Sequence, residues 1–179
     1  MDKSNLVLIG MPGAGKSTVG VILAKRLGFD FIDTDVLIQA KRRRRLQDII
    51  DREGLAAFCR IEEEILLALQ AQRAIVATGG SVVYSEAGMR ALRKNGLIVF
   101  IDVPLPELEK RIRDMDTRGM VIDPGETLAD LYRRRLPLYR RWADRTLNWR
   151  EETMEEVAAR VSHLATSLDF DPFREDNIS

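Results

Sequence analysis

The sequence predicts an α/β fold in which a five-stranded parallel sheet carries helices on both faces. Short apolar segments alternate along the chain with longer segments whose apolar residues recur at helical spacing, the order expected of parallel strands joined by helices. The strand-like segments are apolar throughout, as in strands that are buried on both faces. The first of them, residues 6–9, runs directly into a glycine-rich loop at residues 10–17.

Residues 10–17 read Gly-Met-Pro-Gly-Ala-Gly-Lys-Ser and match the pattern G-x-x-x-x-G-K-[ST] of a phosphate-binding loop. The glycines let successive backbone N–H groups face one anion, and the N-terminus of the helix expected at 18–27 favours negative charge. In this pattern Lys16 reaches the β- and γ-phosphates, and the Ser17 hydroxyl holds Mg²⁺. The residues of this region expected to bind ATP are Gly13, Ala14, Gly15, Lys16, Ser17 and Thr18.

The composition indicates a soluble protein, and we expect residues 1–179 to form a single domain with a substantial core. The 28 basic and 28 acidic residues cancel, so net charge favours neither nucleic acid nor a membrane surface as a partner. A single cysteine, Cys59, excludes an intrachain disulfide. No apolar run approaches the roughly 20 residues of a membrane span, and the first strand begins too early for a signal peptide. We therefore expect a cytoplasmic protein, and we also expect it to be a monomer.

The remaining elements follow from apolar periodicity and from glycine or proline at their ends. Gly28 is expected to end the first helix. Further strands are expected at 29–32, 74–77, 97–103 and 145–149, the last at an edge of the sheet. Further helices are expected at 36–50, 55–70, 85–94, 107–113, 128–143 and 151–168. Pro137 predicts a kink or a break in its helix, and residues 169–179 are expected to form a polar tail.

Aspartates and glycines follow two of the predicted strands. Asp33 and Asp35 come after the second strand, and Gly79 and Gly80 come after the third. Because ligands of parallel sheets bind at the carboxyl ends of the strands, we expect these residues near the phosphate-binding loop. One aspartate then coordinates Mg²⁺ and the other accepts a proton from an attacking hydroxyl group. The alternative role is to cap the following helix, and both roles are compatible.

Two further segments allow two interpretations each. Residues 41–45 read Lys-Arg-Arg-Arg-Arg, and five consecutive charges on a helix point around more than one turn. They form either a solvated helix segment or a surface that captures an anionic substrate or polyanion. Residues 114–126 hold few core candidates and contain Arg118. They form either a mobile lid that brings Arg118 onto a transferring phosphate or an exposed linker.

Together these motifs resemble those of the shikimate kinase family, small nucleoside monophosphate kinase-like proteins with a phosphate-binding loop. The resemblance covers about residues 5–161 and implies a lid and a helical acceptor-binding segment at about 35–62. Outside the phosphate-binding loop it rests on Asp33 and Asp35, on Gly79-Gly80-Ser81, on Arg111 and Arg118, and on Arg135, Pro137 and Tyr139.

The resemblance implies transfer of the ATP γ-phosphoryl group to shikimate, giving shikimate 3-phosphate for aromatic amino acid biosynthesis. In this reading Lys16, Asp35 and Arg118 are catalytic, and Asp35 also binds the acceptor hydroxyl. Asp33 and Ser17 hold Mg²⁺, and Arg111 lies against adenine. The acceptor is further held by Gly79, by Gly80 and by Arg135, which anchors its carboxylate.

The acceptor side departs from the family pattern, in which a Gly-Glu-x-x-Phe-Arg segment supplies a second arginine to the shikimate carboxylate. Here Leu55 replaces the glutamate and Cys59 replaces that arginine. Arg60 would substitute as a substrate-binding residue only if its side chain reaches around the helix, because it is rotated by about 100°. The family also has glycine at the position of Arg43. Two alternatives stay open: a kinase of this fold for another small hydroxy acid or hydroxy amino acid, or an ATP-binding regulator without turnover.

Overall fold

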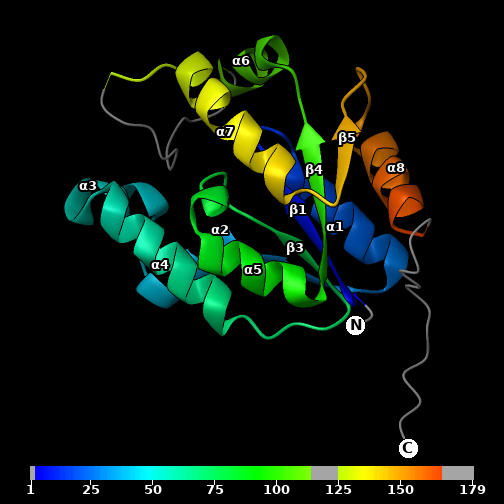
Figure 1. Cartoon of the computed structure of the whole chain (residues 1–179), viewed down its shortest axis with the longest axis horizontal. Coiled ribbons are helices and arrows are strands. Elements are labelled where there is room, and N and C mark those ends of the chain that lie inside the picture. The colour runs from blue at the N-terminus through cyan, green and yellow to red at the C-terminus, as the bar shows by residue number, and fades with distance from the viewer. Residues whose placement is uncertain (1–2, 114–124, 167–179) are drawn as a thin grey trace, which may run out of the picture.

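Five parallel strands form one sheet in the order β2-β3-β1-β4-β5 (Figure 1). This computed structural model describes residues 3–113 and 125–166. The strands are β1 (Asn5–Ile9), β2 (Asp30–Asp33), β3 (Ala74–Ala77), β4 (Gly96–Asp102) and β5 (Arg145–Asn148). The predicted sheet is therefore confirmed, including the position of the last strand at an edge.

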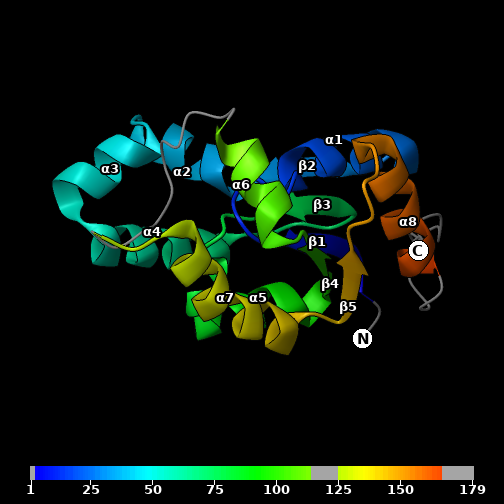
Figure 2. The same cartoon turned by 90° about the horizontal axis from the view of Figure 1, so that it is seen from above.

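Helices cover both faces of the sheet, with α1 and α8 on one face and α5 and α7 on the other (Figure 2). The helices are α1 (Lys16–Leu27), α2 (Thr34–Arg42), α3 (Leu46–Glu53), α4 (Leu55–Ala68), α5 (Glu86–Asn95), α6 (Leu105–Arg113), α7 (Leu128–Trp142) and α8 (Met154–Thr166), with a short 3₁₀ helix η1 (Val82–Tyr84). Strands β1, β3 and β4 are almost wholly buried between these layers, which explains their continuous apolar sequences.

A second apolar cluster is formed between α2, α3 and α4, separate from the core around the sheet. It consists of Ile38, Ile49, Phe58, Ile61 and Ile65, with the Cys59 side chain packed beside it. These helices project from one side of the sheet (Figure 1). The cluster therefore gives the segment that follows β2 a core of its own.

Two predicted helices differ from expectation. The helix expected at 36–50 is broken into α2 and α3, because Arg43 adopts a left-handed conformation with φ 52° and ends α2. Helix α7 runs without a break through Pro137, which lies inside it. The described residues contain no helix long and apolar enough to cross a membrane. Residues 114–124 of the predicted lid and the whole predicted tail lie outside the described ranges.

Ion pairs account for part of the basic run at 41–45. Arg42 lies 3.4 Å from Glu64 of α4, and Arg44 lies 3.4 Å from Glu53 at the end of α3. All five residues of the run are exposed. This arrangement favours the interpretation of a solvated helix segment over that of an anion-binding surface.

Candidate active site

The phosphate-binding loop joins β1 to α1 at the edge of the sheet where all five strands end. Gly13 and Gly15 have φ angles of 78° and 87°, which an L side chain rarely adopts. Gly15 is the N-cap of α1, and no side chain caps this helix, so its first N–H groups are available to an anion. The buried Lys16 ammonium donates to the carbonyl oxygens of Gly10 and Met11, each at 2.9 Å.

Asp33 joins the end of β2 to the phosphate-binding loop. The Ser17 hydroxyl donates to Asp33 Oδ2 at 2.6 Å, while Oδ1 accepts from the backbone N–H groups of Asp35 and Val36. Asp33 therefore caps α2 and also lies beside Ser17, so both of its predicted roles are compatible with the geometry. A hydroxyl and a carboxylate oxygen side by side are ligands that suit Mg²⁺, which takes its remaining ligands from water and phosphates.

Asp35 lies against Gly79, as the positions of their strands predict. A β-carbon at Gly79 would lie 2.7 Å from Asp35 Oδ1, so only glycine leaves room for this carboxylate. Burial, followed by the charge of Asp33, raises the pKa of Asp35 to about 6, against the opposing effect of Lys16. The carboxylate is thus ionised at neutral pH but more basic than an exposed aspartate, which suits a group that accepts a proton.

Glu62 also belongs to this site, although no motif of the sequence indicated it. Its side chain is buried, and Oε2 accepts a hydrogen bond from the Ser81 hydroxyl at 2.7 Å. Burial is the main cause that raises the pKa of Glu62 to about 7. Oε1 is buried too and accepts no hydrogen bond from the described residues. Its spacing in the sequence could have indicated this burial, because Glu62 follows Phe58 by four residues and therefore lies on the apolar face of α4.

Arg135 lies on the side of the site that is predicted to hold the acceptor. It is fully buried, and its Nε donates to the Tyr84 hydroxyl at 3.1 Å. A β-carbon at Gly80 would lie 3.0 Å from Arg135 Nη1 and 2.8 Å from Pro12 of the phosphate-binding loop. The Tyr139 hydroxyl donates to the Gly80 carbonyl oxygen at 2.6 Å. Arg135, Gly80 and the phosphate-binding loop therefore meet at one place, as predicted.

Arg111 lies beside the phosphate-binding loop. Its guanidinium contacts the Gly13 carbonyl oxygen at 3.4 Å and lies 4.8 Å from the centre of the Trp149 ring. The Met154 sulfur lies 2.7 Å from the position of a β-carbon at Gly15. Trp149 and Met154 border the nucleotide side, and no local sequence pattern had indicated either of them.

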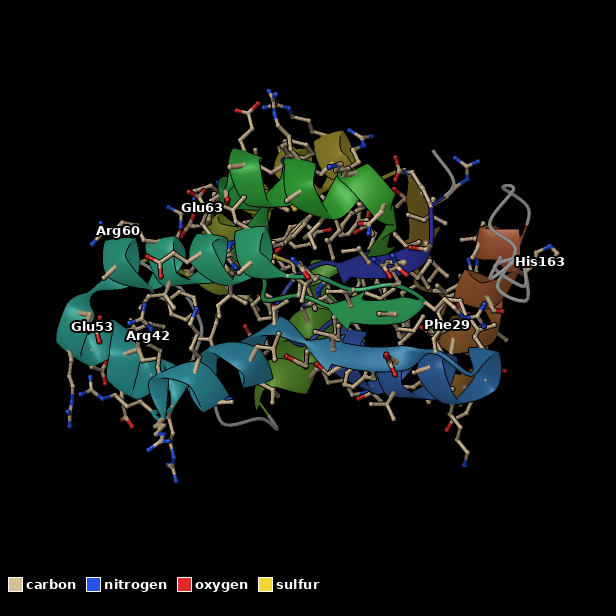
Figure 3. The ribbon with its side chains drawn as sticks, turned by 90° about the horizontal axis from the view of Figure 1, so that it is seen from below. Phe29, Arg42, Glu53, Arg60, Glu63 and His163 are labelled. Atoms are coloured by element: carbon tan, nitrogen blue, oxygen red, sulfur yellow. The ribbon has the colours of Figure 1, made fainter. Side chains whose placement is uncertain are left out.

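One predicted site residue is not part of this cluster, and another lies outside the described residues. Arg60 is exposed on α4, and Figure 3 shows its side chain directed outward from the helix. Within the described part of the chain it makes no hydrogen bond or ion pair with the buried groups, so the reach around the helix considered for Arg60 is not seen. Its rotation of about 100° from Cys59 explains why. Arg118 lies outside the described residues.

The site combines donors for phosphate, a buried base and a buried cation. Lys16 lies close enough to Asp35, Asp33, Arg135 and Glu62 for each of their charges to affect its pKa, which burial lowers to about 8. Phosphate oxygens would meet the loop N–H groups and the ammonium, while a hydroxyl acceptor would meet the carboxylate of Asp35. This arrangement suits transfer of a phosphoryl group, which depends on positioning and on neutralising charge.

Comparison with known proteins identifies the family. The family model described as "Shikimate kinase" matches residues 12–165. A shikimate kinase from Paracidovorax citrulli is 40% identical over 167 residues, covering 90% of this chain and 90% of that protein. One from Thermodesulfovibrio yellowstonii is 36% identical over 160 residues, covering 88% and 92%. The structure of shikimate kinase from Acinetobacter baumannii in complex with shikimate has a TM-score of 0.84 and 30% identity, covering 92% of this chain and 94% of that one. This chain, a small-molecule kinase, therefore belongs to the shikimate kinase family.

Proposed function

We propose that this protein transfers the γ-phosphoryl group of ATP to the 3-hydroxyl group of shikimate. The observation that carries the proposal is the shared position of Lys16, Asp35 and Arg135 at the ends of the strands, which sets a phosphate-binding group, a base and a carboxylate-binding group around one space. Family membership supports the identity of the acceptor, since the relatives carry the name shikimate kinase.

On the nucleotide side, the loop N–H groups and Lys16 hold the phosphates, and Arg111 lies against adenine. Ser17 and Asp33 would hold Mg²⁺, which supplies charge neutralisation when bound. Arg118 would add a second positive charge to the transferring group, as a lid arginine does. The protein is expected to work as a cytoplasmic monomer.

On the acceptor side, Asp35 binds the attacking hydroxyl group and takes its proton as the new P–O bond forms. The bond between the γ-phosphorus and the bridging oxygen breaks, and ADP leaves. Arg135 anchors the acceptor carboxylate, while Gly79 and Gly80 let the ring approach the backbone. The reaction is accelerated mainly because the two substrates are held in line in a site that already carries the required charges.

A coupled assay for ADP release with ATP, MgCl₂ and shikimate tests this proposal, with the phosphorylated product confirmed by mass spectrometry. Shikimate-dependent ADP release is expected from the wild type. Lys16→Ala should lose at least 100-fold in kcat, since one preorganised donor is worth about that much. Its melting temperature should stay close to that of the wild type. Near-normal turnover of Lys16→Ala would contradict the assigned role of the loop.

Cys59 favours a second candidate, a kinase of the same fold for another small hydroxy acid. The family supplies an arginine at this position, and loss of one charge-assisted hydrogen bond weakens binding by roughly 1.5–3 kcal/mol. A panel of hydroxy acids and hydroxy amino acids in the same assay distinguishes the two. A kcat/KM higher for another acceptor than for shikimate would favour the second candidate. If no acceptor of the panel causes ADP release, the result would favour a regulator without turnover.

A further inference from the structure

Tyr84 lies where η1 ends, four residues after Gly80, and its ring is in contact with two arginines of α7. The guanidinium of Arg135 lies 5.1 Å from the ring centre and that of Arg134 lies 5.6 Å from it. The same Tyr84 hydroxyl oxygen accepts the hydrogen bond from Arg135 Nε at 3.1 Å. One side chain therefore fixes the guanidinium of Arg135 in two ways, by a hydrogen bond and by contact with the ring face.

The hydrogen bond from Arg135 leaves the Tyr84 hydroxyl with a proton to donate. A phenol hydroxyl can donate one hydrogen bond and can also accept. The hydrogen bond from Arg135 Nε uses only the accepting capacity of the Tyr84 oxygen. Tyr139 is different, because its hydroxyl proton is directed to the Gly80 carbonyl oxygen at 2.6 Å. Tyr84 is 37% exposed, and its hydroxyl lies 3.1 Å from Arg135 Nε, so a ligand that contacts this guanidinium also lies close to the Tyr84 hydroxyl.

The charges on the acceptor side indicate which ligand group this donor would meet. Arg135 directs Nη1 toward Gly80, and its Nε edge is used by Tyr84. Cys59 supplies no positive charge, and the buried carboxylate of Glu62 already lies near Arg135. A neutral O–H group is therefore a suitable second donor for a carboxylate bound to Arg135.

We propose that Tyr84 is the second anchor of the acceptor carboxylate, donating its hydroxyl proton to one carboxylate oxygen while its oxygen orients Arg135. The proposal rests on the proposed function, because it concerns the acceptor of that reaction. Tyr84, at the end of η1, would then supply the second carboxylate contact that the family obtains from an arginine at the position of Cys59. The proposed hydrogen bond requires the acceptor carboxylate. An acceptor without that group therefore distinguishes this role from a purely structural role of Tyr84.

The test is Tyr84→Phe, which removes the hydroxyl and keeps the ring against both arginines. The readout is kcat and KM with shikimate, compared with an analogue in which hydrogen replaces the carboxylate. For shikimate we expect kcat/KM to fall about tenfold, mainly through a higher KM, the size expected for one hydrogen bond. The KM for ATP should stay unchanged. With the analogue, wild type and variant should differ by less than about twofold, because the missing bond has no partner there.

The matched control is Tyr132→Phe, a tyrosine of the same helix as Arg135 whose hydroxyl contacts Asp102 at 3.5 Å instead. It should leave the KM for shikimate unchanged. An equal loss of kcat/KM with shikimate and with the analogue would overturn the proposal, since Tyr84 would then act only by supporting the site. An unchanged KM in Tyr84→Phe would overturn it as well. Absence of shikimate phosphorylation by the wild type would instead overturn the proposed function.

Discussion

Asp35 and Glu62 each hold one carboxylate oxygen within 2.7 Å of the point where a β-carbon of Gly79 would lie. Two buried carboxylates thus share the space above one glycine, and the charge of Asp35 is among the causes that raise the pKa of Glu62. The proposed function gives Asp35 a use as a base, but it gives Glu62 none that requires its charge. Keeping it ionised and buried costs folding free energy.

Glu62→Gln should therefore stabilise the protein at pH 8. The pKa of Glu62 is raised to about 7 in the folded state, so the folded protein binds more protons than the unfolded chain between about pH 4.5 and 7. The free-energy cost of burying the ionised Glu62 is absent below pH 4.5, the pKa of Glu62 in the unfolded chain, and reaches its full size above about pH 7. Urea denaturation should give the variant a free energy of unfolding up to about 3 kcal/mol higher at pH 8, with a much smaller difference at pH 5.

Glu64→Gln is the control for that comparison. Glu64 lies on the same helix, but its side chain is exposed and pairs with Arg42 only at 3.4 Å. Its substitution should change the free energy of unfolding by less than about 0.5 kcal/mol at either pH. A Glu62→Gln effect of equal size at pH 5 and pH 8 would show that the Glu62 carboxylate carries no such cost.

The pH dependence of kcat/KM for shikimate, measured with ATP well below its own KM, should be bell-shaped. Asp35 must be ionised to accept a proton, and its pKa is about 6, so kcat/KM should rise with pH through about 6. Lys16 must stay protonated to neutralise phosphate charge, and burial lowers its pKa to about 8, so kcat/KM should fall above that pH. In the kcat profile the upper limb should move to higher pH, because bound ATP favours the ammonium form.

Asp35→Asn tests the base directly. The amide keeps the size of the side chain but cannot take the proton of the hydroxyl group, so kcat should fall by at least 100-fold. The KM for ATP should change little, because Asp35 lies on the acceptor side. A variant with normal kcat and a raised KM for shikimate would show that Asp35 binds the acceptor without acting as a base.

Cys59→Arg should lower the KM for shikimate. Residues 59 and 62 are three apart on α4 and lie on adjoining parts of one helix face, so an arginine at 59 can approach Glu62 Oε1, which accepts no hydrogen bond from the described residues. It would also add a positive charge beside the acceptor carboxylate, which favours a several-fold lower KM. Arg60→Ala is the control, since Arg60 is exposed on another side of α4, and its KM should equal that of the wild type.

The sheet and the positions of residues around the phosphate-binding loop could be predicted because their signals are local. Asp33, for example, ends the short strand β2, and parallel strands bring their carboxyl ends to the same edge of the sheet. The contact between Tyr84 and Arg135 joins residues 51 positions apart, and no periodicity specifies it. Glu62 was missed for another reason, because only its spacing of four residues from Phe58 indicates that this charged side chain is buried.

The break between α2 and α3 was missed because Arg43 lies inside a run of good helix formers. Its left-handed conformation, with φ 52° and ψ 37°, is one that a side chain makes unfavourable by roughly 1–2 kcal/mol and that glycine adopts freely. Arg43→Gly should therefore stabilise the protein, by about 1 kcal/mol once the greater freedom of glycine in the unfolded chain is subtracted. Chemical denaturation at pH 7.5 measures the change.

Arg44→Gly isolates the conformational origin of that gain. Arg44 is exposed like Arg43 and precedes the same helix, but its φ angle is not positive. Both substitutions give the unfolded chain the same extra conformational freedom. The Arg44→Gly variant also loses an exposed ion pair with Glu53, which contributes less than about 1 kcal/mol to stability. Arg44→Gly should thus destabilise the protein while Arg43→Gly stabilises it. If both variants shift the free energy of unfolding in the same direction, relief of charge repulsion in the basic run, rather than backbone strain at Arg43, controls the stability of this segment.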